Sequence, residues 1–198
     1  MTPRRFASGI ASGLALAILT FAVAACGTRQ LVLSVDLLSF ISPADRDTTF
    51  STPVLTPVAI HTTYTLVNNQ RMTLFQGLNN VTDSPSVDLN AALQVQGTRD
   101  SADATLNIYL AADGQNPRST TALFSTPVRI RDGQTQTVTF ALSSLSLAEQ
   151  ARVADLVTHS AVQVAVDIDL SVPAFTQPAG KMTLTQLEAT VRADRPKL

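Results

Sequence analysis

Hydrophobic and polar residues alternate along most of the chain beyond residue 30, which is the pattern of β-strands with one face in a core and the other in water. The alternation is clearest in the segments 31–37, 86–97 and 161–172. The residues expected to face the core are Leu31, Leu33, Val35, Leu37, Val87, Leu89, Ala91, Leu93, Val95, Val162, Val164, Val166, Ile168 and Leu170. Strands with one apolar face and one solvent-exposed face are typical of antiparallel sheets in a sandwich.

Three further segments have the same period. Residues 104–110 and 182–193 are the clearer two, and 57–68 is a weaker strand. The apolar residues in phase are Leu106, Ile108 and Leu110 in the first, Leu187, Ala189 and Val191 in the second, and Val58, Ile60, Tyr64 and Leu66 in the third.

A β-hairpin is predicted around Asp132-Gly133, a turn signal between two alternating segments. A two-residue loop would send the apolar residues of the two strands to opposite faces. A three-residue loop, Arg131–Gly133, unites them instead, so we expect this loop, with a bulge and a left-handed Gly133. The shared face would hold Phe124, Val128, Ile130, Val138, Phe140 and Leu142.

One helix is expected at residues 146–158, where Ser146 and Glu149 have the spacing of a capping box. Its predicted apolar stripe consists of Leu147, Ala151, Ala154 and either Leu156 or Val157. The helix should cover one end of the sheets. The chain beyond the leader shows no repeat of solenoid period, and we expect residues 31–198 to form a single all-β domain, an antiparallel β-sandwich that is immunoglobulin-like or similar.

The first 25 residues have the organisation of a signal peptide. Arg4 and Arg5 provide a positive start, and an uncharged apolar run with several small residues follows. A retained transmembrane helix is the main alternative, because about 18 to 20 apolar residues can span a bilayer. The run ends at Val23-Ala24-Ala25-Cys26, which includes the single cysteine of the chain.

This tetrapeptide resembles the lipobox of bacterial lipoproteins. The resemblance implies cleavage between Ala25 and Cys26, with diacylglycerol on the Cys26 sulfur and an acylated amino group. The alternative is a small buried cysteine in an ordinary signal peptide or membrane helix. In organisms with two membranes, Gly27 after the cysteine resembles the residue of lipoproteins that are sent to the outer membrane, where the protein would face the periplasm. Residues 26–30 would then be a tether, whose four residues after the cysteine reach roughly 13 Å.

The charge of the chain argues against nucleic acid as a partner. The net charge is −1, and without the leader 12 basic residues face 15 acidic ones, a balance of −3. Two of the basic residues are lysines, Lys181 and Lys197, and no basic stripe with interleaved aromatic residues is present. With a single cysteine, no disulfide can form within the chain.

Candidate catalytic and metal-binding residues are few. His61 and His159 lack the spacing of a zinc site, and His159 is explained by a favourable position at a helix C-terminus. The pairs Asp167/Asp169 and Asp45/Asp47 could serve acid–base hydrolysis or bind calcium, but outward-facing charge that solubilises the surface is the favoured interpretation. We therefore predict no catalytic, cofactor-binding or metal-binding residue.

The sequence thus predicts a lipid-anchored envelope lipoprotein, held in its membrane through Cys26, with a non-enzymatic binding or structural sandwich. Its expected partner is an envelope protein or a lipid. The alternative function is carriage of an apolar ligand, such as a lipid or acyl chain, between the sheets. A hydrolase that uses Asp167 or Asp45 is the least favoured possibility.

Overall fold

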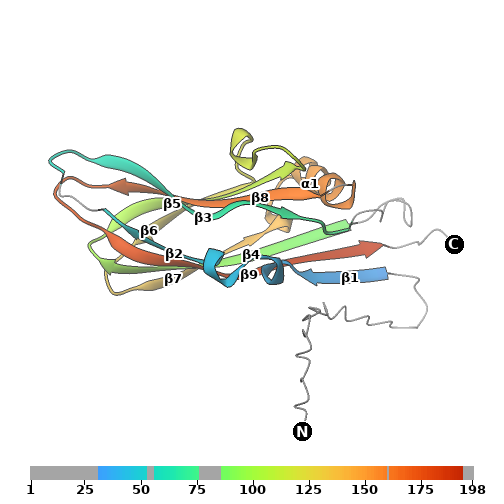
Figure 1. Ribbon diagram of the computed structural model, residues 1–198, viewed down its shortest axis with the longest axis horizontal. Coiled ribbons are helices and arrows are strands. Elements are labelled where there is room, and N and C mark those ends of the chain that lie inside the picture. The colour runs from blue at the N-terminus through green and yellow to red at the C-terminus, as the bar shows by residue number, and fades with distance from the viewer. Residues whose placement is uncertain (1–30, 53–55, 76–85, 160, 194–198) are drawn as a thin grey trace, which may run out of the picture.

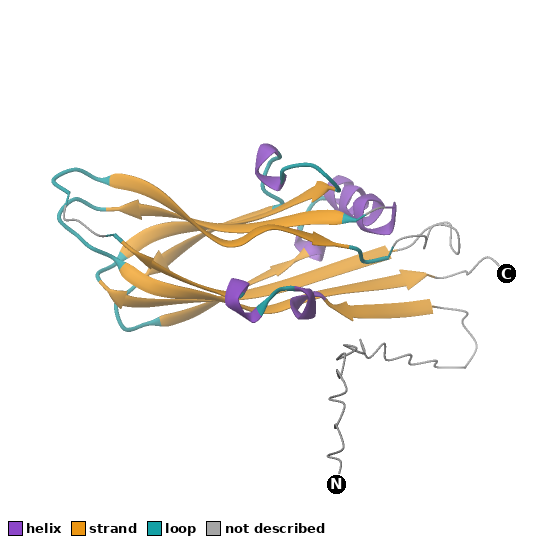
Figure 2. Cartoon of the chain, in the orientation of Figure 1, coloured by secondary structure: helices purple, strands orange, loops and turns teal. Residues whose placement is uncertain are grey.

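The computed structural model describes residues 31–52, 56–75, 86–159 and 161–193 and shows an all-β sandwich of two antiparallel sheets with one α-helix. The sheets stack face to face, and the long axis of the molecule follows the strands (Figures 1 and 2). The fold class predicted from the alternating pattern is confirmed.

The chain changes sheet at most of its connections. Sheet A has the order β1-β9-β4-β7, with β2 also paired to β9, and sheet B has the order β3-β8-β5-β6. The strands of sheet A are β1 (Leu31–Asp36), β2 (Asp47–Ser51), β4 (Ser86–Arg99), β7 (Thr135–Ala141) and β9 (Ala179–Ala193); those of sheet B are β3 (Ile60–Met72), β5 (Ala102–Ala112), β6 (Phe124–Ile130) and β8 (Val162–Val172). Within the described residues, β5 and β6 are the only successive strands that pair with each other.

The core lies between the sheets and follows the predicted alternation closely. Every residue that the pattern placed inward on β4, β5 and β8 is buried. Leu93, Leu106 and Ile168, near the centre, have no exposed surface. Burial of such a side chain contributes about 1.5–3 kcal/mol relative to leaving it in water, so these strands supply much of the driving force for folding.

Strand β9 contains a bulge that explains a change of phase in its sequence. Met182 and Leu184 are buried at even positions, whereas Leu187, Ala189 and Val191 are buried at odd positions. The register with β4 shifts at this point, and the Thr185 hydroxyl donates to the Ala92 carbonyl at 3.0 Å. One extra residue reverses which face each side chain takes, so both halves of β9 point their apolar residues inward.

One edge of sheet A is divided between two short strands. β1 and β2 pair with successive halves of β9 and are joined by the 3-10 turns η1 (Leu37–Phe40) and η2 (Pro43–Asp45). The Leu184 amide donates to the Arg46 carbonyl at 2.8 Å, which ties this connection to the bulge. A short, interrupted edge presents few unpaired backbone groups for association with another chain.

The hairpin predicted around Asp132-Gly133 is wrong in its pairing. β6 belongs to sheet B and β7 to sheet A, so residues 131–134 form a corner between the sheets. Gly133 does have the expected left-handed backbone, with φ of 69°, and its amide donates to the Gly97 carbonyl. The predicted apolar face is correct, because both strands point these residues into the same core even though they do not pair.

Helix α1 (Leu147–His159) leads from β7 in sheet A to β8 in sheet B and lies at one end of the sandwich (Figure 1). The predicted stripe is partly wrong, since the side chain of Leu147 is 83% exposed and Ala151 is also exposed. The rest of the stripe is confirmed, because Val157 is buried and Ala154 packs against the core, and Val153, which was not predicted, completes the buried face. The helix therefore packs through its later turns and leaves its first turn in water.

The capping box is confirmed. The Ser146 hydroxyl accepts from the Glu149 amide at 3.3 Å, and the Glu149 carboxylate accepts from the Ser146 amide at 3.2 Å. We expect Ser146→Ala to lower the free energy of unfolding by about 1 kcal/mol, since an amide of the first turn loses its acceptor. Urea unfolding measures this loss. Ser143→Ala, at an exposed serine just before the cap, is the control, and equal losses in both variants would contradict a capping effect.

The two ends of the sandwich are distinct. At the N-terminal end, Leu31 at the start of β1 pairs with Ala193 at the end of β9. At the other end, which we call the distal end, Ser51 pairs with Ala179. The 14 steps along β9 separate the ends by about 45 Å at a rise of about 3.3 Å per residue. The loops from β2 to β3, β4 to β5, β6 to β7 and β8 to β9 gather at the distal end (Figure 1).

Candidate functional site

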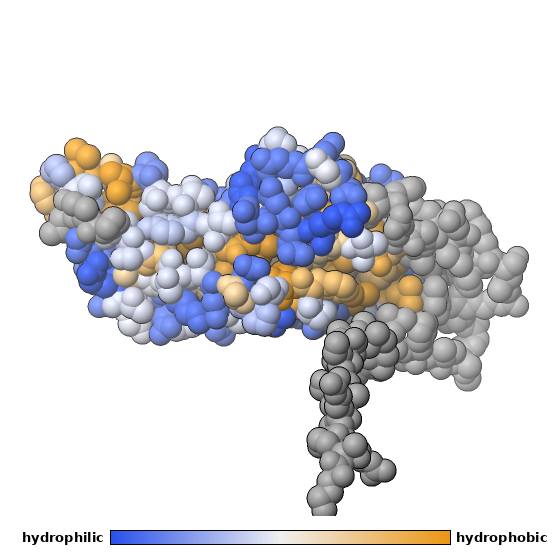
Figure 3. Space-filling model, viewed as in Figure 1, coloured by the Kyte–Doolittle hydropathy of each residue, from blue (hydrophilic) through white to orange (hydrophobic). Residues whose placement is uncertain are grey.

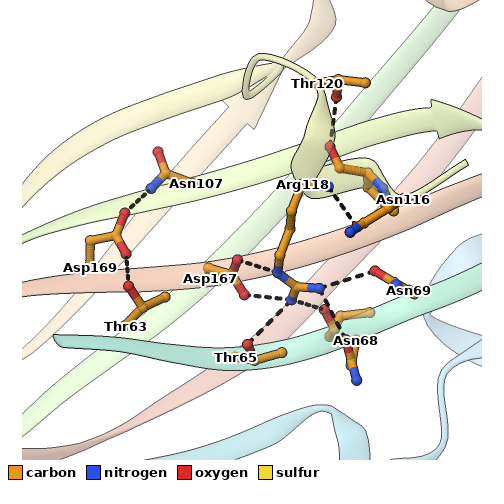
Figure 4. A network of polar contacts seen from close by, with 12 residues as sticks. Thr63, Thr65, Asn68, Asn69, Asn107, Asn116, Arg118, Thr120, Asp167 and Asp169 are labelled. Atoms are coloured by element: carbon orange, nitrogen blue, oxygen red, sulfur yellow. Dashed lines mark hydrogen bonds and ion pairs between the residues drawn. The ribbon is translucent and has the colours of Figure 1, made fainter.

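Polar side chains gather on the outer face of sheet B, beneath the connection between β5 and β6 (Figure 4). The antiparallel register sets Thr65, Asp167 and Asn107 side by side on three neighbouring strands. These residues alternate with core residues, so they point away from the interior. Asp169 lies two residues further along β8 on the same face.

Arg118 is the centre of this network. It lies in the 3-10 turn η4 (Pro117–Ser119), whose start is capped by the Asn116 side chain accepting from the Arg118 amide at 3.1 Å. The guanidinium forms a two-pronged ion pair with Asp167: Nε donates to Oδ2 and Nη2 to Oδ1, both at 2.7 Å. Bidentate pairs of this kind are the strong class of charge-assisted hydrogen bond.

The rest of the guanidinium contacts β3. Nη1 donates to the side-chain oxygens of Asn68 and Asn69, both at 3.0 Å, and Nη2 donates to Thr65 Oγ1 and the Val67 carbonyl, both at 3.3 Å. The register between β3 and β8 shifts here, and Asn69 has φ of 51°. Arg118 therefore joins the β5–β6 connection to β8 and to the irregular part of β3, and all three guanidinium nitrogens are engaged.

The ion pair is partly shielded from water. The side chain of Asp167 is 3% exposed and that of Arg118 is 27% exposed. Hydrogen bonding to Asp167 raises the pKa of Arg118, against the opposing effect of desolvation. Burial raises the pKa of Tyr109, and the charges of Asp169 and Asp167 add to this effect while Arg118 opposes it. These effects favour the neutral form of Tyr109 to a higher pH than in a free tyrosine.

Asp169 is also engaged by protein donors. Its carboxylate accepts from Thr63 Oγ1 at 2.5 Å and from Asn107 Nδ2 at 2.7 Å. The two carboxylates that the sequence put on one face thus serve separate contacts, one with a cation and one with neutral donors. An arrangement whose donors and acceptors are matched internally acts as a structural clamp on the β5–β6 connection.

The expectation that Asp167 solubilises the surface is wrong. It does face away from the core, but Arg118 and η4 cover it, and the residue is 2% exposed. Arg118 was not predicted as the partner of Asp167, because the two residues lie 49 positions apart and alternation says nothing about what covers an outer face. The short turn Asn116-Pro117, typical of a 3-10 start, was the one local signal near it.

The other predicted residues do not join this network. Ala25 and Cys26 lie outside the described residues. His61 is exposed on β3, and His159 is the last residue of α1. Asp45 and Asp47 are exposed, as expected, and hydrogen bonds from Thr183 and Lys181 lower the pKa of Asp47.

The described parts of the chain contain neither a cluster of metal-ligating side chains nor a membrane-spanning helix. No group of three or more His, Cys, Asp or Glu side chains there could hold a metal ion. Among the same residues, no helix has the length and apolarity needed to cross a membrane.

No family model and no curated protein matches the chain. A chain in the structure of infectious bursal disease virus, Gx strain, is 14% identical, with a TM-score of 0.38, over 98% of this chain and 42% of that one. A chain from a structural study of CBM4 is 16% identical, with a TM-score of 0.25, over 65% of this chain and 59% of that one. This chain thus spans less than two thirds of the length of either.

Proposed function

We propose that this chain is a lipid-anchored lipoprotein of the bacterial cell envelope, with a sandwich that serves as a non-enzymatic binding or structural domain. The observation that carries the proposal is the position of Cys26, which follows Val23-Ala24-Ala25 at the end of a charged and then apolar leader. Gly27 after the cysteine supports an outer-membrane location facing the periplasm in an organism with two membranes.

The start of the fold supports an anchor close to the membrane. β1 begins at Leu31, at the N-terminal end of the sandwich. The four residues after Cys26 span at most about 13 Å, so this end would stay beside the bilayer while the distal end extends from it or lies along it. A protein of the same envelope is then the nearest class of partner.

The contacts on the outer face of sheet B support a non-enzymatic role for the domain. Asp167 is the one charged side chain that is buried among the described residues, and its carboxylate is paired with Arg118. Asp169 is held by Thr63 and Asn107, so both carboxylates are occupied by contacts within the protein.

The alternative of an apolar ligand between the sheets has less support. Leu93, Leu106 and Met182 belong to one continuous cluster in the interior, and none has exposed surface. Close packing of this kind leaves no room for an acyl chain at that point. Native mass spectrometry of the Cys26→Ser protein tests the alternative, since a lipid that co-purifies with the unacylated chain would favour carriage.

Loss of the thiol is expected to abolish lipid attachment. In cells fed a fatty acid with a clickable tag, the wild-type chain should take up the label and shorten to a form beginning at residue 26. Cys26→Ser should remain unlabelled and keep its leader, because both acylation and cleavage of a lipoprotein need the sulfur. Gel mobility, label and intact mass report the result. Thr28→Ala, in the tether, should behave as wild type. An unlabelled wild type, or normal processing of Cys26→Ser, would contradict the proposal.

A further inference from the structure

Two loops at the distal end present large apolar side chains to water. Phe175, between β8 and β9, is 71% exposed, and Val58, just before β3, is 63% exposed. Val58 was expected to lie in a strand, but β3 begins at Ile60. Apolar surface gathers at the loop-bearing end of the molecule in the space-filling view (Figure 3). We call Val58 and Phe175 the apolar tip.

The backbone of Phe175 is held in an unfavourable conformation. Its φ is 60°, in the left-handed region, where a bulky residue is a genuine outlier. Its amide donates to the Thr56 carbonyl at 2.9 Å, which joins the two loops of the tip. Strained backbone persists where surrounding contacts over-determine it, and such positions cluster at functional sites. Because the Phe175 ring is exposed, the strained backbone does not bring it into packing contacts that would stabilise the fold.

Further hydrogen bonds fix both loops. Thr56 Oγ1 donates to the Val58 carbonyl at 2.7 Å, and Thr176 Oγ1 donates to the Pro173 carbonyl at 2.8 Å.

The β8–β9 loop is also tied to the end of β4. Arg99 Nε donates to the Gln177 carbonyl at 2.8 Å, and the Gln177 amide donates to Asp100 Oδ2 at 2.7 Å. The tip is therefore a preorganised surface.

We propose that the apolar tip docks into an apolar pocket of an envelope protein, with Phe175 as the inserted side chain and Val58 beside it. This inference rests on the proposed binding function and names its surface and its class of partner. Segments 56–59 and 173–178 carry no charged residue, so an apolar pocket matches the contact, while exposed Arg99 and Asp100 lie beside it. Rigid aromatic side chains are the usual anchors of protein interfaces, because little entropy is lost when they bind.

The fixed geometry favours a protein pocket over a lipid surface. A fluid bilayer accepts an apolar side chain in any direction, so it gives no advantage to a strained backbone that sets one direction. A pocket requires one direction, and preorganisation then strengthens binding. Two side chains are also far less than the roughly 800 Å² per partner of a stable interface, which disfavours pairing of two copies through the tip alone. A pocket that encloses the Phe175 ring buries more surface per side chain than a second copy of the tip could, and anchoring in a shared membrane raises the effective concentration of either partner.

Site-specific photocrosslinking in cells tests the contact. The full anchored chain carries benzoylphenylalanine at position 175, or at exposed Thr137 on the outer face of sheet A as the control. A single discrete adduct with another protein is expected from position 175 and not from position 137. Labelling with the tagged fatty acid in the same cells reports the anchor separately. A labelled chain with no adduct overturns the docking proposal alone, whereas an unlabelled chain overturns the proposed function.

Affinity for the crosslinked protein, once purified, is then compared among variants. Phe175→Gly removes the ring at a position where glycine suits the backbone, so it should be at least as stable to urea as wild type and lose affinity by tenfold or more. Leu147→Ala removes another highly exposed apolar side chain, away from the tip, and should leave affinity unchanged. Adducts with lipid alone, adducts with a second copy of the chain, or unchanged affinity of Phe175→Gly would each overturn the proposal.

Discussion

Asp167→Ala is expected to lower the free energy of unfolding by about 3–5 kcal/mol, the loss typical of breaking a buried ion pair from one side. The substitution leaves the Arg118 guanidinium beneath its own turn without its carboxylate, and the side chain is too covered to be solvated fully in place. Urea unfolding of the purified protein measures the change. We also expect faster proteolysis of the β5–β6 connection, which Arg118 holds against β8.

Two companion variants separate the charge from the general cost of a lost side chain. Asp169→Ala removes a carboxylate from the same face of the same strand, but its partners Thr63 and Asn107 are neutral. It should lose about 1.5–3 kcal/mol, the range for hydrogen bonds to a charged group. The double variant Arg118→Leu/Asp167→Leu should recover much of the stability lost in Asp167→Ala, because no unpaired charge remains. If the double variant is as unstable as the single one, the charge is not the cause.

The parts of the fold that the sequence predicts well are those set by burial on one face. β4 and β8 lie inside their sheets and have one side against the core, so each inward position must be apolar, and the alternation is regular. The apolar positions of β9 change phase at Thr185 and Gln186, and that change marks the bulge. A pattern of period two therefore predicts directly which side chains contact the core.

The pairing of strands cannot be predicted from this alternation. An Asp-Gly turn suits a hairpin, but it equally suits the corner at Asp132-Gly133, where the chain leaves sheet B for sheet A. Both arrangements put the same apolar residues inside. The choice is made by contacts distant in sequence, including the Gly133 amide with the Gly97 carbonyl, which no local pattern specifies.

The same limit applies to the outer face of sheet B and to α1. Alternation predicted that Asp167 points outward, but the turn that covers it belongs to another connection. In the helix, a stripe that includes Leu147 and Ala151 and one that includes Val153 and Val157 are both compatible with helical spacing. The second is buried because the later turns are the ones that meet the core, a fact of tertiary structure.

Gly180→Ala is expected to lower the free energy of unfolding by about 3 kcal/mol, at the upper end of the usual cost of overpacking. A Cβ at this position would collide with the backbone carbonyl oxygen of Gln96 on β4 and with the ring of Phe50. Phe50 lies opposite Gly180 in the register of β2 and β9, is 1% exposed, and packs against Tyr64 of sheet B with ring centroids 6.0 Å apart. The ring therefore occupies the space left by the missing side chain and cannot withdraw without opening the contact between the sheets.

Gly114→Ala is the matched control for this effect. Gly114 has φ of 76° and no atom within 4 Å of the position that a Cβ would take. Its substitution should cost about 1–2 kcal/mol, from backbone strain alone. The backbone of Gly180 is not left-handed, so its substitution adds no strain of this kind. A larger loss of stability in Gly180→Ala than in Gly114→Ala, measured by urea unfolding, therefore isolates the steric contact with Phe50 and Gln96. Phe50→Leu combined with Gly180→Ala should recover less than the whole loss, because the smaller side chain relieves the ring contact but not the collision with the carbonyl. A Gly180→Ala protein that is no less stable than Gly114→Ala would show that β4 and β9 can separate at this point, and the close packing of Phe50 over Gly180 would then not be a constraint on the distal end.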